Sequence, residues 1–121
     1  MRPLTVLLVD DNRDFLYFLE RLMQDSGWNL LTAESGTDAR RIFVEHRPHA
    51  AVVDYMLPDE NGIELAVKFR KIVPGMTIVT MTGTILPPKE EALIEENNFH
   101  HLRKPFLPSE AMDLIKAAAR D

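Results

Sequence analysis

The sequence has no cysteine, no long apolar run and no excess of positive charge. The lack of cysteine excludes disulfides and thiolate metal sites, and it suits a reducing compartment. No stretch approaches the ~18 consecutive apolar residues of a membrane span, and the apolar run near the N-terminus is too short for a secretory signal. The net charge of −5 argues against binding of nucleic acid or an anionic membrane by this domain. We therefore expect a soluble cytoplasmic domain.

What is present indicates a single globular domain over residues 1–121. Hydrophobic residues make up 45% of the chain and charged residues 27%, which is typical of folded domains rather than disordered chains. This length suffices for one hydrophobic core.

Short apolar runs alternate with amphipathic segments along the whole chain. The runs predict strands at 4–9, 29–33, 50–53, 76–81 and 99–103. The amphipathic segments predict helices at 15–23, 35–46, 63–72, 87–98 and 108–118. Such alternation predicts an α/β fold, with a parallel sheet that helices cover on both faces.

Polar side chains stand where four of the predicted strands end. In chain order they are Asp10, Asp11, Asp54, Thr82 and Lys104. Ligands of open α/β sheets bind beyond the carboxyl ends of the strands, and a strand order of 2-1-3-4-5 would bring all of these groups to one edge. Each group also has an ordinary interpretation: a helix cap for the acidic pair, a strand-end hydroxyl, a surface lysine. Their joint placement favours a site.

The chemistry of this set points to a divalent cation and a phosphoryl group. Three carboxylates at close range repel one another, and a hard cation or protonation relieves the repulsion. Oxygen ligands without His or Cys favour Mg²⁺, with Mn²⁺ as a second possibility. An ammonium from Lys104 and a hydroxyl from Thr82 would offset charge on a phosphoryl group in transfer. Asp54, the most central carboxylate, is then the candidate nucleophile that forms an aspartyl phosphate.

The motifs carrying these residues resemble the receiver domain of two-component response regulators along the whole chain. They are Val6-Leu-Leu-Val-Asp-Asp11, Val53-Asp54-Tyr-Met-Leu-Pro58, Gly62, Thr82-Gly83 and Lys104-Pro-Phe106. The resemblance implies a flavodoxin-like (βα)5 three-layer sandwich of strand order 2-1-3-4-5. It also implies a signalling switch, not an enzyme in the ordinary sense, that assists its own phosphorylation and dephosphorylation at Asp54.

The resemblance assigns a role to each site residue and a class to each partner. Asp10, Asp11 and Asp54, with the backbone carbonyl of Met56, would hold Mg²⁺, while Thr82 and Lys104 would contact the phosphoryl group. The bond between Lys104 and Pro105 would be cis. The donor would be a sensor histidine kinase or a histidine phosphotransfer protein. The surface formed by helix 87–98, strand 99–103 and helix 108–118 would act on a downstream effector domain or protein, or form a homodimer.

Two positions depart from the family pattern. His101 stands where members usually carry Tyr or Phe, so the switch would be shallower or pH-sensitive; the simpler expectation, which we adopt, is a strand residue that faces water. Met56 stands where polar residues are common in the family. Its bulky side chain should hinder an attacking water, which predicts a long-lived phosphoaspartate.

Three other functions compete with this one. A flavodoxin-like cofactor binder would need a glycine- and hydroxyl-rich phosphate loop where Asp10 and Asp11 stand. A haloacid-dehalogenase-type phosphatase would need a second acid at the position of Met56. A degenerate receiver that only binds partners would lack active-site groups that this sequence retains.

Overall fold

The computed structural model describes residues 3–119 and contains a five-stranded parallel sheet in the order β2-β1-β3-β4-β5, which confirms the predicted fold. The strands are β1 Thr5–Val9, β2 Asn29–Ala33, β3 Ala50–Asp54, β4 Thr77–Thr82 and β5 His100–Arg103. The helices are α1 Arg13–Met23, α2 Gly36–His46, α3 Gly62–Ile72, α4 Pro88–Glu96 and α5 Pro108–Ala119, with a 3₁₀ turn at Gln24–Ser26.

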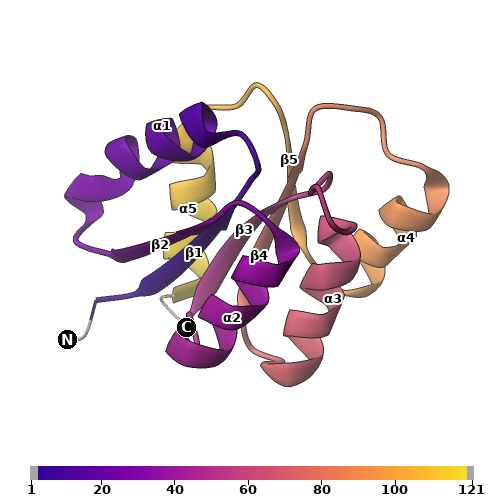
Figure 1. Ribbon diagram of the computed structural model, residues 1–121, viewed down its shortest axis with the longest axis horizontal. Helices are drawn as coiled ribbons and strands as arrows, with labels where there is room; N and C mark the ends of the chain where they lie inside the picture. The colour runs from indigo at the N-terminus through magenta and orange to yellow at the C-terminus, as the bar shows by residue number, and fades with distance from the viewer. Residues whose placement is uncertain (1–2, 120–121) are drawn as a thin grey trace.

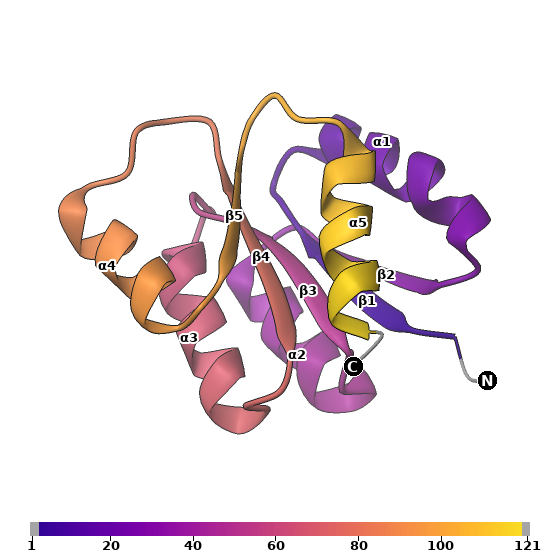
Figure 2. The same cartoon turned by 180° about the vertical axis from the view of Figure 1, so that it is seen from behind.

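The helices form two layers around the sheet. Helices α1 and α5 lie on one face, as the rear view shows (Figure 2), whereas α2, α3 and α4 lie on the other (Figure 1). This is the three-layer arrangement that the alternating pattern predicts. Among the helices of residues 3–119, none has the length and apolar character needed to cross a bilayer.

Side chains of the central strands fill a separate core on each face. Leu7 and Val9 of β1 point to the α2 and α3 side, where Phe43 and Phe69 stack with ring centroids 4.3 Å apart. Leu8, between them in sequence, points to the α1 and α5 side. All three β1 residues are fully buried, as expected for a parallel sheet covered on both faces.

Side-chain caps start the first three helices at the edge where the strands end. Asn12 accepts a hydrogen bond from the backbone N–H of Phe15, Ser35 from that of Asp38, and Asn61 from those at the start of α3. The cap of α1 is therefore Asn12, and the alternative in which the preceding acidic pair serves as the cap is wrong. These caps satisfy N–H groups that would otherwise lack partners.

Gly62 lets α3 begin directly against the end of β3. Its N–H donates to the carbonyl of Tyr55 at 2.7 Å, and a Cβ at this position would overlap the backbone carbonyl of Asp54. Only glycine permits such a close approach of two backbones. The loop after Asp54 is therefore short and closely packed.

Candidate functional site

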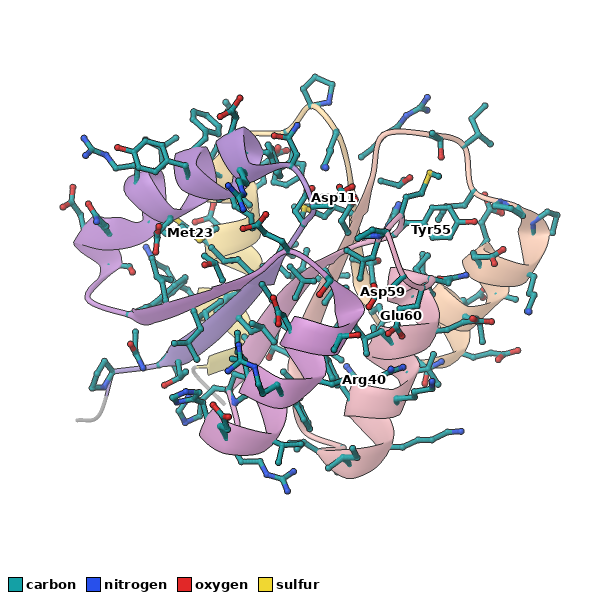
Figure 3. The ribbon with its side chains drawn as sticks, in the orientation of Figure 1. Asp11, Met23, Arg40, Tyr55, Asp59 and Glu60 are labelled. Carbon is teal, nitrogen blue, oxygen red and sulfur yellow. The ribbon has the colours of Figure 1, made fainter. Side chains whose placement is uncertain are left out.

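Asp10, Asp11 and Asp54 meet at the carboxyl edge of the sheet. One oxygen of each lies within 4.8 Å of the others. Asp10 and Asp54 are only 1% and 7% exposed, whereas Asp11, labelled in Figure 3, is open to solvent. The edge thus holds an acidic cluster with one open side, which is the predicted juxtaposition.

Lys104 enters this cluster from the far end of the chain. Its Nζ lies 2.6 Å from Oδ2 of Asp10 and 3.3 Å from Oδ1 of Asp54, and it sits 4.4 Å from the ring centroid of Phe15. The backbone N–H of Lys104 donates to the carbonyl of Thr82 at 2.8 Å, which fixes the strand end from which the side chain reaches. The alternative of a surface lysine is therefore wrong. The bond to the following proline is cis, as the resemblance implies.

The electrostatics of the cluster are unbalanced, because one ammonium faces several carboxylates. Burial first, and the charge of Asp10 second, raise the pKa of Asp54 to about 6, although the charge and hydrogen bond of Lys104 act in the opposite direction. Burial alone would lower the pKa of Lys104, but hydrogen bonds and charges from Asp10 and Asp54 outweigh it, so that pKa is raised. The lysine lies closer to Asp10, which leaves Asp54 as the incompletely neutralised carboxylate.

Thr82 lies at the same edge, at the end of β4. Its neighbour Met81 is the register partner of Asp54. The Thr82 side chain is buried, and its hydroxyl accepts from the N–H of Thr84 at 3.1 Å and also contacts the Thr84 hydroxyl at 3.3 Å. In this structure the hydroxyl is therefore engaged with the loop that follows its own strand.

Met56 lies in the loop after Asp54, next to the acidic cluster. Its backbone forms an isolated antiparallel bridge with Asn61, and its side chain is 62% exposed. An exposed apolar residue thus follows Asp54 by two positions.

His101 does not face water as we expected. It is half-buried, and its Nδ1 lies 2.8 Å from Oγ1 of Thr80 on the neighbouring strand. Burial lowers the pKa of His101, with a smaller opposite effect from Glu91. The ring also lines a cavity of about 280 Å³ that extends to Thr82. The hydrogen bond to a fully buried hydroxyl is the physical reason for the inward orientation.

Several residues of this region escaped the sequence analysis. Asn12 donates its backbone N–H to Oδ1 of Asp10 at 2.9 Å. An asparagine directly before a predicted helix is a capping signal that the sequence already contained. Phe15, whose ring lies beside Lys104, was predicted only as part of the helix at 15–23. Asp59 contacts the start of α2, and Glu90 contacts Asn61, the cap of α3; no local pattern marks either of them.

The family model of the response regulator receiver domain matches residues 6–116. The probable transcriptional regulatory protein TcrX of Mycobacterium tuberculosis is 29% identical over 98% of this chain and 51% of its own length. The transcriptional regulatory protein GltR of Pseudomonas aeruginosa is 30% identical over 96% of this chain and 49% of its own. The chain therefore spans about half the length of these curated relatives.

Solved structures agree with these similarities. A response regulator receiver domain protein from Clostridium thermocellum superposes with a TM-score of 0.88 at 27% identity, over 97% of this chain and 94% of that one. Since the family model covers nearly the whole chain, and the sheet has the order 2-1-3-4-5, the assignment is secure. The chain belongs to the response regulator receiver domain family, whose members serve as signalling switches in two-component systems.

Proposed function

We propose that Asp54 accepts a phosphoryl group from a phosphohistidine on a sensor histidine kinase or a histidine phosphotransfer protein. A carboxylate oxygen of Asp54 forms the new P–O bond while the P–N bond of the donor breaks and the imidazole leaves. The observation that supports this proposal most strongly is the position of Lys104 Nζ, within 3.3 Å of carboxylates at two other strand ends. Residues 1–121 would act as one receiver domain in the cytoplasm.

The acidic cluster suits a divalent cation. Asp10, Asp11 and Asp54 offer only oxygen ligands, and the backbone carbonyl of Met56 would add a neutral one; this set favours Mg²⁺, with Mn²⁺ as an alternative. Burial and then the charge of Asp10 keep the pKa of Asp54 raised at about 6 in spite of Lys104, so a cation that binds the ionised carboxylate would offset a cost that Lys104 leaves. When bound, the cation would supply positive charge opposite the phosphoryl oxygens.

The protein's own residues prepare the nucleophile and receive the charge. At neutral pH a carboxyl with a pKa of about 6 is mostly ionised, so Asp54 can attack. The ammonium of Lys104 remains charged because its pKa is raised. Asp10 holds this ammonium beside Asp54, where it would contact the phosphoryl oxygens after transfer.

The new charge on Asp54 would act through Thr82. Its hydroxyl would leave Thr84 and bond to the phosphoryl group, which would move the loop between β4 and α4. The cavity between Thr82 and His101 provides room for such a movement. The surface of α4, β5 and α5 would then favour a second arrangement, and would act on an effector domain or protein or form a homodimer.

Intact-mass spectrometry tests the proposal. The protein is incubated with acetyl phosphate or phosphoramidate, with and without Mg²⁺. We expect one phosphoryl mass increment that depends on Mg²⁺ and is absent from Asp54→Asn. A label on Asp54→Asn equal to that on the wild type would contradict the assignment of the nucleophile.

A further inference from the structure

The segment between β3 and α3, residues 55–61 (the β3–α3 loop), carries Met56 past the acidic cluster. Its two ends are fixed by the backbone: the N–H of Tyr55 donates to the carbonyl of Met81 at 2.8 Å, and the N–H of Gly62 donates to that of Tyr55 at 2.7 Å. Between these ends the backbone of Met56 bridges to that of Asn61, and the N–H of Leu57 donates to the carbonyl of Glu60 at 3.3 Å. The backbone at Met56 is therefore linked to the outer part of the loop.

Asp59, in the outer part of the loop, is bound to the first turn of α2. Its carboxylate accepts hydrogen bonds from the N–H of Gly36 at 2.8 Å, the N–H of Thr37 at 2.9 Å and the hydroxyl of Thr37 at 2.8 Å. These bonds, that from Gly36 foremost, lower the pKa of Asp59 to about 2, so the carboxylate stays charged at neutral pH. A carboxylate from elsewhere in the chain thus supplements the cap of α2.

Glu60 adds a second contact between the loop and α2. Its Oε1 lies 2.7 Å from a guanidinium nitrogen of Arg40, and a Cβ on Gly36 would overlap the Glu60 carboxyl group. Figure 3 shows Asp59, Glu60 and Arg40 in the region between α2 and α3. The first turn of α2 is therefore shaped to receive this loop.

The opposite side of the loop is held by α4. The side-chain amide of Asn61, which caps α3, donates to Oε1 of Glu90 at 3.1 Å. Glu90 is only 7% exposed, an unusual position for a carboxylate. The loop is thus held from two directions, by α2 through Asp59 and by α4 through Asn61.

We propose that Asp59 is a positioning residue for the divalent cation, because it holds the β3–α3 loop, and with it the Met56 carbonyl, in place beside the acidic cluster. This inference rests on the proposed function of the site. Mg²⁺ tolerates little deviation from octahedral geometry, so a ligand whose support is lost binds it less well. Residues that orient metal ligands contribute about 10- to 100-fold to metal affinity.

Isothermal titration calorimetry with MgCl₂ tests the role of Asp59 without any phosphoryl transfer. We expect Asp59→Ala to bind Mg²⁺ about tenfold more weakly than the wild type, and Asp59→Asn, which retains one acceptor oxygen, to lie between them. Thr37→Ala removes the hydroxyl that donates one of the three hydrogen bonds to Asp59, so it should also weaken Mg²⁺ binding, but less than Asp59→Ala does.

Ser35→Ala is the matched control. The side chain of Ser35 caps the same end of α2 by accepting from Asp38, not from the β3–α3 loop, so its loss should lower Tm while Mg²⁺ affinity stays unchanged. If Asp59→Ala binds Mg²⁺ as the wild type does, or if Ser35→Ala weakens binding as much as Asp59→Ala, the positioning role is wrong. If the wild type itself binds no Mg²⁺, the proposed function of the site fails instead.

Discussion

The substitution Asp54→Asn removes one negative charge from the acidic cluster while it nearly preserves the shape of the side chain. In the folded protein the pKa of Asp54 is raised to about 6, first by burial and then by the charge of Asp10. Ionised Asp54 therefore destabilises the folded state in the absence of a cation. We expect the variant to be more stable than the wild type at neutral pH, although the proposed nucleophile is lost.

The size of the gain follows from the pKa. The rise from 3.8 to about 6 corresponds to roughly 3 kcal/mol at about 1.4 kcal/mol per pH unit. The cluster has an open side, and solvent screening there reduces the effect. We therefore expect Asp54→Asn to raise the free energy of unfolding by about 1–2 kcal/mol at neutral pH.

The gain should depend on pH in a defined direction. Since the folded pKa lies above the unfolded value of 3.8, the destabilisation by Asp54 is complete above about pH 7 and disappears as the pH falls to about 4. Urea unfolding in EDTA, followed by the fluorescence of the single tryptophan, Trp28, measures this difference. A variant that is no more stable than the wild type at neutral pH, or a gain that persists at about pH 4, would refute the reasoning.

The control is Asp59→Asn, the same chemical change at another aspartate, and we expect it to lower the free energy of unfolding instead of raising it. The pKa of Asp59 is lowered to about 2 by hydrogen bonds from Gly36 and Thr37. Its carboxylate therefore stabilises the folded state at every pH above about 4, and this contribution is lost only as the pH falls toward 2. Asp59→Asn should accordingly be less stable than the wild type at neutral pH.

Three further substitutions test separate parts of the account. Lys104→Ala should lower the free energy of unfolding in urea by about 3 kcal/mol, because buried Asp10 loses its partner. The variant should still be phosphorylated by acetyl phosphate, but phosphorylation should no longer change hydrogen exchange in α4 and β5. Met56→Asn should lose its label faster in a mass-spectrometric time course, since water gains access, and an unchanged or slower loss would count against this. Burial lowers the pKa of His101, so the wild type should lose stability as the pH falls below 6.5, and its advantage in free energy of unfolding over His101→Asn should become smaller. An advantage that stays constant with pH would show that the contact with Thr80 is independent of protonation.

Sequence patterns predicted the fold and most of the site because both depend on strand boundaries. The run that ends at Asp54 is apolar at every position, so its end was evident, and the rule for open α/β sheets then brought Lys104 and the acidic pair together. The strand boundaries follow from local composition and the edge that carries the site from a general topological rule, whereas the strand order 2-1-3-4-5 was implied by the resemblance to receiver domains.

Contacts between the side chains of distant segments could not be predicted in this way. Asp59 lies in a stretch with ordinary turn composition, and its partners in α2 are more than twenty residues away. The inward orientation of His101 depends on the buried hydroxyl of Thr80 across the sheet. Glu90 is buried and accepts a hydrogen bond from Asn61, which lies 29 residues away. No periodicity or propensity records such pairs, which arise from tertiary packing.

The most direct measurement of the central claim is the location of the phosphoryl group by peptide mass spectrometry after exposure to acetyl phosphate. If the strand-end groups act together around a cation, the label will lie on the peptide that contains Asp54 and will form only when Mg²⁺ or Mn²⁺ is present. A label on another peptide, or one that forms on Asp54 equally fast in EDTA, would contradict the account.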